Sequence, residues 1–216
     1  PDDSADARIR LSGQRLMDSP WLIGFLILSS YLLGSIPFGV VVSRLLGAVD
    51  PRSAGSRNVG FTNVLRVSGK KAGILTLLGD IGKGWLAGWV GTMLLHQESA
   101  ILWVALASVI GHLHSVFLGF KGGKGVATAL GAALGVAPWI GLTLMGLWVG
   151  AVFLWKYSSG GALFAFAMFP IVALLFHRSW TFIGFACVVS LLIWVRHKDN
   201  LVRLWSGTES RIGQAS

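Results

Sequence analysis

Two segments of the chain combine residue types that are suited to binding phosphate. Residues 55–66 (GSRNVGFTNVLR) bring hydroxyl and amide side chains together with Arg57 and Arg66, and residues 120–128 (FKGGKGVAT) place Lys124 among glycines. Arginine makes bidentate, charge-assisted hydrogen bonds with phosphate. Glycines let successive backbone N–H groups converge on an anion at the start of a helix. Both segments therefore predict phosphate contacts, including backbone contacts at Gly122 and Gly123.

Each segment also has a plainer interpretation. The first is equally compatible with a polar loop whose arginines meet lipid headgroups. The second is compatible with a flexible turn that carries lysines on the inner side of a membrane. It is not a Walker A motif, because the Gly-x4-Gly-Lys-Ser/Thr spacing is missing.

Asp80 and Lys83 stand three residues apart inside an apolar stretch, in residues 79–84 (GDIGKG). A charge at this depth in a membrane segment indicates a functional site or a paired charge. Residues i and i+3 of a helix are neighbours. We therefore favour an internal ion pair that fixes helix packing and supports the site.

Other polar residues are further candidates for a site. His112 precedes the glycine segment, and His197 would share a helical face with Asn200. Ser159 follows a short polar connection, where a helix N-cap is an equal alternative. A metal site needs three or four converging ligands. His112 and His197 have no carboxylate or cysteine cluster beside them in the sequence, so we predict no metal.

The sequence contains none of the familiar motifs for a catalytic nucleophile. The Gly-x-Ser-x-Gly elbow is missing, and no histidine has an aspartate five positions on, as in the large class of lipid acyltransferases. Acyl transfer by this chain would therefore need a donor that is already activated.

The composition predicts that these residues are positioned by membrane helices. Hydrophobic residues make up 54% of the 216 residues and charged residues only 12%, and the mean hydropathy is +0.70. Soluble domains carry about 25% charged residues. The apolar stretches follow one another with short gaps, which predicts one all-α bundle that spans the membrane. They are residues 21–46, 73–95, 100–117, 125–155, 160–176 and 180–195.

The stretch 125–155 is long for one crossing and short for two, and Pro138 near its middle is a break signal. The positive-inside rule separates the two alternatives. With the N-terminus outside, seven helices leave only Arg8, Arg10, Arg15 and Arg178 outside, so 14 of the 18 Lys and Arg lie inside. Six helices would place ten inside. We predict seven, with a short fourth helix, 125–137, of ~20 Å beside a polar hollow.

This topology places four polar segments on the cytoplasmic side, where they would form one site: residues 47–72, 118–125, 156–160 and 196–216. The predicted organisation is a polar N-terminal tail (1–20), a catalytic membrane domain (21–196) and a basic cytoplasmic C-terminal tail (197–216). The first 18 residues mix acidic and basic side chains, which does not indicate a cleavable signal peptide. The single cysteine, Cys187, allows no disulfide within the chain.

Four stretches resemble the bacterial acyl-phosphate:glycerol-3-phosphate acyltransferases (the PlsY family). They are residues 34–39 (GSIPFG), residues 55–71 with 79–84, residues 111–128 with the long glycine segment, and residues 196–204 (RHKDNLVRL). The resemblance runs from about residue 21 to 213. It implies seven helices with an external N-terminus, in agreement with the charge distribution.

The resemblance also implies an activity. The donor would be acyl-phosphate and the acceptor glycerol-3-phosphate, with lysophosphatidic acid and phosphate as products, in the first step of phospholipid synthesis at the inner membrane of a bacterium. No coenzyme A, other cofactor or metal would be needed, and a substrate phosphate would accept the proton. By the same resemblance, phosphate would be held by Ser56, Asn58, Thr62, Arg66 and Lys124. Ser159 would bind a substrate oxygen, and His197 and Asn200 would orient the acceptor.

The chain departs from the family pattern at a few positions. Arg57 replaces Gly, Phe61 replaces Ala, His114-Ser115 replaces an aromatic-Pro pair, and Ala162 stands where some members have Ser. The main rival function is a transporter or channel for an organic phosphate or other anion, which would use a similar cavity. A third is an assembly protein whose glycine-rich helices only pack. The positive charge does not require nucleic acid, because topology and phosphate substrates account for it.

Overall fold

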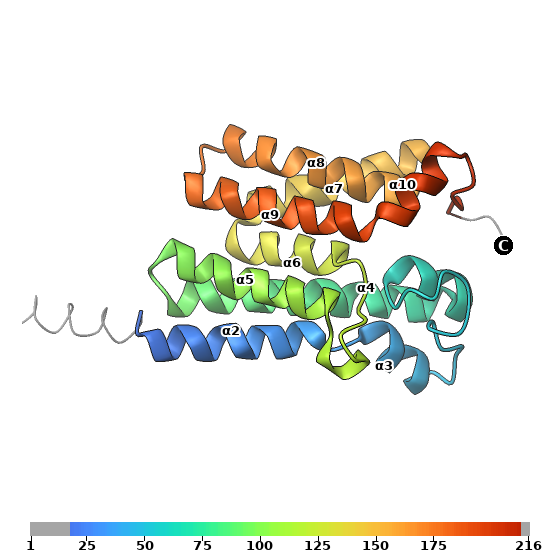
Figure 1. The fold of residues 1–216 in the computed structure, drawn as a ribbon, viewed down its shortest axis with the longest axis horizontal. Helices are drawn as coiled ribbons and strands as arrows, with labels where there is room; N and C mark the ends of the chain where they lie inside the picture. Colours follow the sequence, from blue (N-terminus) through green and yellow to red (C-terminus); the bar gives the residue numbers. More distant parts are fainter. Residues whose placement is uncertain (1–17, 213–216) are drawn as a thin grey trace, which may run out of the picture.

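The computed structural model describes residues 18–212, and this part of the chain is all helical (Figure 1). The predicted N-terminal tail lies outside the described residues up to position 17. The elements are α2 (Pro20–Ser35), α3 (Phe38–Leu45), α4 (Phe61–Leu94), α5 (Glu98–Leu113), the 3₁₀ turn η1 (Val116–Leu118), α6 (Val126–Val136), α7 (Pro138–Trp155), α8 (Ser158–Leu175), α9 (Trp180–Arg196) and α10 (Lys198–Trp205).

Local sequence signals explain several helix boundaries. The Ser19 side chain accepts a hydrogen bond from the backbone N–H of Leu22 at 3.4 Å and caps α2, whose first residue is a proline. Ser179 caps α9 in the same way, at 3.1 Å from the N–H of Phe182. The break predicted at Pro138 is confirmed, because α6 ends at Val136 and α7 begins with that proline.

Two predicted boundaries are wrong. The stretch 21–46 is not one helix, since α2 and α3 meet at Ile36-Pro37 with a bend of 46°. Residues 47–72 are only partly a loop, because α4 begins at Phe61 and continues through a local break at Gly69, where φ is 87°. Within the predicted C-terminal segment, residues 198–205 form α10, which is bent by 62° from α9.

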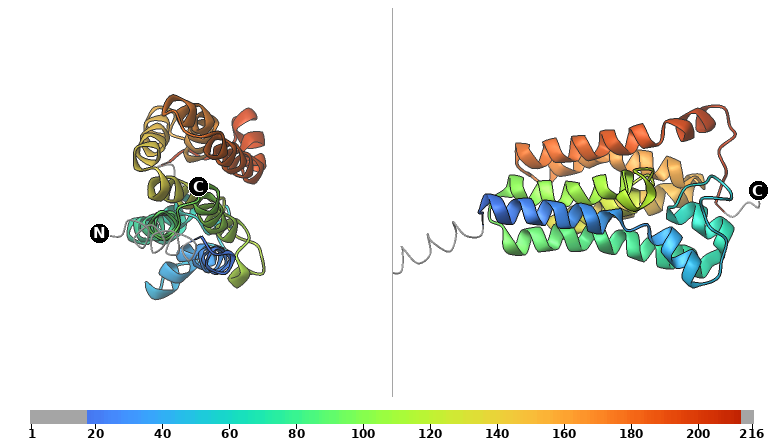
Figure 2. Two further views of the ribbon diagram at one scale, coloured as in Figure 1. Left: turned by 90° about the vertical axis from the view of Figure 1, so that its left-hand side faces the viewer. Right: turned by 60° about the horizontal axis from the view of Figure 1, so that its bottom comes forward.

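The helices are arranged so that α6 lies at the centre of the bundle. It packs against α4, α5 and α7, while α7, α8 and α9 form one side and α2 and α4 the other (Figures 1 and 2). The contact between α4 and α6 is close because glycines face it. A Cβ built on Gly84 would lie 2.0 Å from the carbonyl oxygen of Thr128, and one on Gly131 would lie 2.0 Å from that of Ile81. Small residues allow such close approach in membrane bundles.

Replacing Gly84 with alanine is expected to destabilise the protein by about 1–3 kcal/mol, because the added methyl group cannot fit against the backbone of α6. Gly82→Ala is a matched control on the same helix. A Cβ at Gly82 meets no atom within 4 Å, so this variant should be neutral or slightly stabilising. Thermal unfolding in detergent micelles would compare the two. Equal midpoints would contradict the close packing of α4 on α6.

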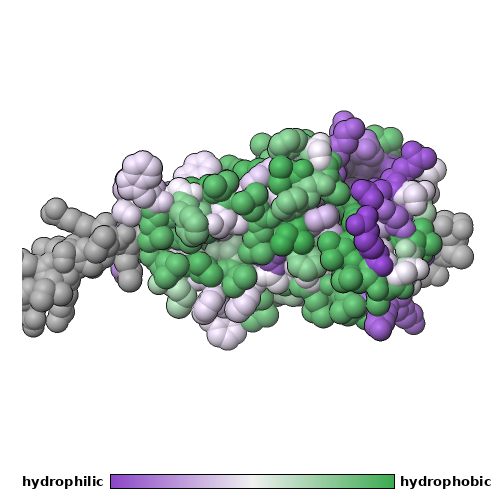
Figure 3. Space-filling model, turned by 90° about the horizontal axis from the view of Figure 1, so that it is seen from below, coloured by the Kyte–Doolittle hydropathy of each residue, from purple (hydrophilic) through white to green (hydrophobic). Residues whose placement is uncertain are grey.

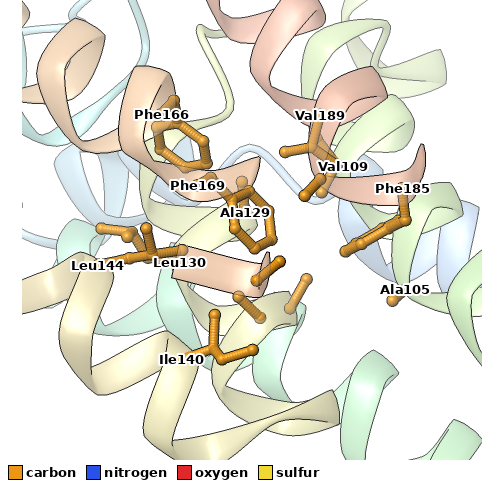
Figure 4. Close-up of a cluster of buried hydrophobic side chains, with 14 of the residues drawn as sticks. Ala105, Val109, Ala129, Leu130, Ile140, Leu144, Phe166, Phe169, Phe185 and Val189 are labelled. Atoms are coloured by element: carbon orange, nitrogen blue, oxygen red, sulfur yellow. The ribbon is translucent and has the colours of Figure 1, made fainter. Parts of the chain in front are cut away.

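The largest apolar core contains buried residues of α5, α6, α7, α8 and α9, and Figure 4 shows part of it in close-up. Phe166 and Phe169 of α8 pack edge-to-face with ring centroids 6.1 Å apart, and Phe169 lies 6.1 Å from both Phe182 and Phe185 of α9. Such pairs add to the free energy gained by burying the rings. This core fixes α8 and α9, which carry part of the polar site described below.

The outer surface suits a bilayer. Apolar side chains cover the middle of the face drawn in Figure 3, and polar ones gather at the end where the described chain finishes. Three helical segments are long and apolar enough to cross a membrane, namely α5 with η1, α7 and α8. The bent pairs α2–α3 and α9–α10 raise this to five, and α6 is a shorter apolar helix. The short fourth helix of the sequence prediction is thus present.

Candidate functional site

A cavity of about 440 Å³ lies at this polar end of the bundle. Segments that are distant in the sequence form it: the connection before α4, α4 itself, the start of α6, the start of α8, and α10 with the residues that follow. Ten of the predicted site residues line it: Ser56, Asn58, Thr62, Arg66, Asp80, His112, Lys124, Ser159, His197 and Asn200. The polar hollow expected beside the fourth helix is present, because Gly125, Val126 and Ala127 line the same cavity.

The connection before α4 is held by Asn63, a buried residue without a predicted role. Its side-chain oxygen accepts from the backbone N–H of Ser56 at 2.9 Å. Its amide nitrogen donates to the carbonyls of Pro51 and Asn58, each at 2.9 Å. Gly55 has a φ of 59°, and a Cβ there would lie 2.3 Å from the Asn63 oxygen. One buried amide thus fixes the backbone that presents Ser56 and Asn58 to the cavity.

Lys124 reaches the cavity from the loop before α6 and donates a hydrogen bond to the side-chain oxygen of Asn200 on α10. Burial lowers the pKa of Lys124 to about 8, although the carboxylate of Glu209 opposes this effect. The Lys124 ammonium group therefore carries its proton at neutral pH, and the carboxylate of Glu209 offsets only part of its positive charge. A cation in this state is suited to binding an anionic substrate.

Glu209 is the main residue of this site that the sequence analysis missed. Its Oε1 accepts from the Ser159 hydroxyl and from the Asn200 amide, each at 2.6 Å, and its Oε2 accepts from Arg203 at 2.7 Å. The pKa of Glu209 is lowered because these three hydrogen bonds outweigh its burial. One of only two acidic residues in the basic tail was the available signal, but its spacing matched no motif.

His197 lies where α9 meets α10 and is buried. Its Nδ1 is 2.8 Å from the carbonyl oxygen of Ile193. Because a carbonyl can only accept, Nδ1 carries the proton and Nε2 is the acceptor of the neutral ring. Burial lowers the pKa of His197 to about 4. The imidazole is therefore neutral at physiological pH and a weak base.

Ser159 was predicted to bind substrate or to cap a helix, and the capping alternative is wrong. The N-cap of α8 is Tyr157, with no side-chain capping bond. The Ser159 hydroxyl instead donates to Glu209 in the cavity. Its neighbour Ser158 forms a hydrogen bond of 2.8 Å with Thr62, which links the start of α8 to the start of α4.

Gly122 and Gly123 do not line the cavity, which corrects their predicted backbone contacts with phosphate. Their N–H groups donate to the carbonyls of Leu113 and His112 at 3.1 and 3.0 Å. Their own carbonyls accept from Arg196 at 2.9 and 3.0 Å. A Cβ at Gly122 would lie 2.0 Å from the His112 oxygen. These glycines are needed for close packing, and the loop they form presents Lys124.

Asp80 and Lys83 form the predicted ion pair, with 2.8 Å between Oδ1 and Nζ. Both side chains are almost fully buried, and Lys83 also donates to the carbonyl of Ile36 at the bend between α2 and α3. His112 lies 3.5 Å from Asp80 and 3.1 Å from the hydroxyl of Thr128. Lys83 does not line the main cavity, whereas Asp80 and His112 do. The pair joins α4 to the bend behind the cavity.

The cavity combines two kinds of lining. Arg66, Lys124 and Arg203 supply positive charge. The rest of the lining includes apolar side chains, which are Phe61, Leu77, Val126, Ala127, Leu130, Trp148 and Ala162. Within residues 18–212, no group of three or more His, Cys, Asp or Glu side chains is placed to hold a metal ion. The arrangement is suited to molecules that carry both phosphate and an apolar chain.

Two of the departures from the family pattern lie in this apolar part, since Phe61 and Ala162 both line the cavity. Arg57 does not line it. It is exposed and has a left-handed backbone, with φ of 57°. Glycine adopts this conformation at a lower energetic cost than arginine does.

The chain is similar to known proteins over most of its length. A family model described as glycerol-3-phosphate acyltransferase matches residues 24–207. A glycerol-3-phosphate acyltransferase of Bordetella petrii is 50% identical over 203 residues, which cover 90% of this chain and 95% of the relative. One of Laribacter hongkongensis is 50% identical over 188 residues, covering 85% and 93%.

Two solved structures are also similar. They are crystal structures of PlsY (YgiH), an integral membrane glycerol 3-phosphate acyltransferase, in a glycerol 3-phosphate form and a lysophosphatidic acid form. Their TM-scores are 0.82 and 0.80, both at 41% identity and covering 88% of this chain and 96% and 95% of theirs. The match of sequence and fold extends over nearly the whole chain, and this protein belongs to the glycerol-3-phosphate acyltransferase family.

Proposed function

We propose that this protein transfers a fatty acyl group from acyl-phosphate to the 1-hydroxyl of glycerol-3-phosphate, the first step of phospholipid synthesis. The products are lysophosphatidic acid and inorganic phosphate. The observation that carries the proposal is that Arg66, Lys124 and Arg203 line the same cavity as a set of apolar side chains. Two phosphate groups and the start of an acyl chain have matching partners there, and the family relationship supports the same reaction.

The proposed roles follow the positions of the side chains around the cavity. Ser56 and Asn58 donate to phosphate oxygens from the connection before α4, and Thr62 does so from its first turn. Arg66 adds a bidentate contact from α4. Lys124 supplies charge from the loop before α6. Ser159 binds a substrate oxygen, while His197 and Asn200 orient the acceptor. Asp80, Lys83 and His112 support the site from behind, and Gly122 and Gly123 shape the loop that carries Lys124.

The reaction needs little acid or base from the protein. The acceptor hydroxyl oxygen attacks the acyl carbon, the bond from that carbon to the phosphate oxygen breaks, and phosphate leaves as a stable anion. Because the low pKa of His197 makes it a weak base, the hydroxyl proton passes to a substrate phosphate. The protein contributes by holding the two reactants together and stabilising the developing charge.

The proposed topology has seven membrane helices, which are α2 with α3 as one bent span, α4, α5, α6, α7, α8 and α9. The N-terminus is outside, and the C-terminus and the active site face the cytoplasm of a bacterial inner membrane. The excess of Lys and Arg at the end that holds the cavity supports this orientation. Residues 1–20 form a tail, 21–196 the catalytic domain and 197–216 a C-terminal segment that contributes Asn200, Arg203 and Glu209 to the site.

The proposed partners are acyl-phosphate, glycerol-3-phosphate and membrane lipids, without metal, coenzyme A or nucleic acid. A comparison of donors tests this choice. Purified protein in lipid would be given glycerol-3-phosphate with palmitoyl-phosphate, palmitoyl-CoA or palmitoyl acyl carrier protein, each with and without a chelator. Lysophosphatidic acid is expected from palmitoyl-phosphate alone, and the chelator should have no effect. Faster synthesis from either thioester would contradict the proposed donor.

The alkaline limb of the pH profile should report Lys124. Its pKa of about 8 means that the ammonium group loses its proton as the pH rises above 8, so attraction to substrate phosphate weakens. The KM of the anionic substrates is expected to rise about tenfold for each unit of pH above that value. Lys124→Arg should keep a flat KM in this range, since a guanidinium stays charged. The same rise in both proteins would contradict this assignment.

A further inference from the structure

The apolar part of the cavity adjoins the surface that faces lipid. Leu77 of α4 lines the cavity, and its neighbour Leu78 is 60% exposed. Trp148 of α7 also lines the cavity, and its neighbour Val149 is 57% exposed. On both α4 and α7 the exposed, lipid-facing surface therefore begins one residue away from the cavity lining. A volume of about 440 Å³ is at the lower end for a ligand pocket, so an acyl chain held with a second substrate must extend out of it toward lipid.

Two aromatic side chains narrow this boundary. Phe61, the first residue of α4, packs edge-to-face on Trp148, with ring centroids 6.4 Å apart and planes at 76°. Both rings line the cavity and are half-buried. They therefore stand at its edge, between the polar site and the lipid-facing surface.

The position of the indole ring is fixed by its surroundings. Trp148 Nε1 donates to the carbonyl of Ser158 at 3.4 Å, and the hydroxyl of Ser158 is 2.8 Å from that of Thr62, the residue after Phe61. On α8, a Cβ at Gly161 would lie 2.9 Å from the carbonyl oxygen of Trp148 and 3.2 Å from its ring. The absence of a side chain at Gly161 lets the indole lie against α8. Because the two rings are in contact, they form one fixed aromatic wall at the edge of the cavity. This wall narrows the space beside it through which an acyl chain would leave, and we call it the constriction.

We propose that Phe61, held against Trp148, determines which acyl chains the enzyme accepts, by limiting their cross-section and not their length. This inference rests on the proposed function and adds a specificity-determining pair to it. A straight chain passes the constriction as a single file of methylene groups, whatever its length beyond that point. A chain with methyl branches presents a wider section and must displace one of the two rings.

The test compares hexadecanoyl phosphate with 3,7,11,15-tetramethylhexadecanoyl phosphate, whose branches are distributed along the chain so that one meets the constriction. Misfit by one methyl group changes kcat/KM by roughly 10–200-fold. The wild-type protein should therefore prefer the straight donor by at least about tenfold. Phe61→Ala should remove most of this preference, and Phe61→Leu should remove part of it. The preference between straight chains of different length should stay unchanged in every variant.

Two further variants sharpen the test. Phe25→Ala makes the same change at a residue of α2 that is 65% exposed and does not line the cavity, and it should leave the ratio of the two donors unchanged. Trp148→Leu should relax the ratio as Phe61→Ala does, because it removes the other half of the constriction. A ratio within twofold of wild type in both Phe61→Ala and Trp148→Leu would overturn the proposal. Failure of the wild-type protein to acylate glycerol-3-phosphate with hexadecanoyl phosphate would instead overturn the proposed function.

Discussion

Replacing Lys124 with alanine is expected to reduce kcat/KM for acyl transfer by roughly 10²–10³-fold, which is the usual effect of removing one donor that stabilises developing charge. Lys124 lines the cavity and donates a hydrogen bond to Asn200, and the carboxylate of Glu209 offsets only part of its charge. Without it, the leaving phosphate loses a cation in a partly buried setting where electrostatic interactions are strong. The rate of lysophosphatidic acid formation in lipid would give the value.

Lys121→Ala is the matched control for this prediction. Lys121 belongs to the same glycine loop and carries the same charge, but it is exposed and does not line the cavity. Its replacement should change kcat/KM by no more than about twofold, because an exposed charge is screened by salt. A comparable loss in both variants would show that the loop acts through its overall positive charge. Lys124 would then have no specific role.

The second large effect concerns stability. Lys83→Met is expected to lower the free energy of unfolding by about 3–5 kcal/mol, because it leaves the buried carboxylate of Asp80 without its cation. The variant also loses the hydrogen bond from Nζ to the carbonyl of Ile36, which ties α4 to the bend between α2 and α3. The midpoint of thermal unfolding in detergent micelles would fall accordingly.

The double variant Asp80→Asn/Lys83→Met separates the ion pair from the rest of the packing. Removing both charges avoids an uncompensated buried ion, so the double variant should be more stable than Lys83→Met alone. Asp80→Asn is measured alone as well. If the double variant loses as much free energy of unfolding as the two single variants lose together, the two charges act independently. That result would contradict the role of Asp80 and Lys83 as a structural pair.

The sequence predicted most of the helical architecture because apolar stretches and breaking residues are local signals. Pro138 was recognised as a break, and the short helix before it was inferred from charge. The bend at Pro37 and the helical start of α4 at Phe61 were missed. A proline flanked by apolar residues does not show whether a membrane helix bends or continues. The polar first turns of α4 resemble a loop in composition.

Some residues of the site were predicted from the sequence and others were not. Residues whose own chemistry suits phosphate, such as Arg66 and Lys124, do line one cavity. Glu209 was missed because its contacts with Ser159 and Asn200 depend on how the chain folds back after α10. Gly122 was assigned to phosphate because glycine can present its N–H group to an anion. Only the tertiary structure shows that this N–H group is already bonded to Leu113.

The most direct test of the proposed function is the release of inorganic phosphate from palmitoyl-phosphate by the purified protein in lipid. Release should require glycerol-3-phosphate, should match lysophosphatidic acid formation one to one, and should collapse in Lys124→Ala while persisting in Lys121→Ala. Folded protein that releases no phosphate under these conditions, or that releases it equally without glycerol-3-phosphate, would contradict the proposed reaction. A transport assay with an organic phosphate would then be the next experiment.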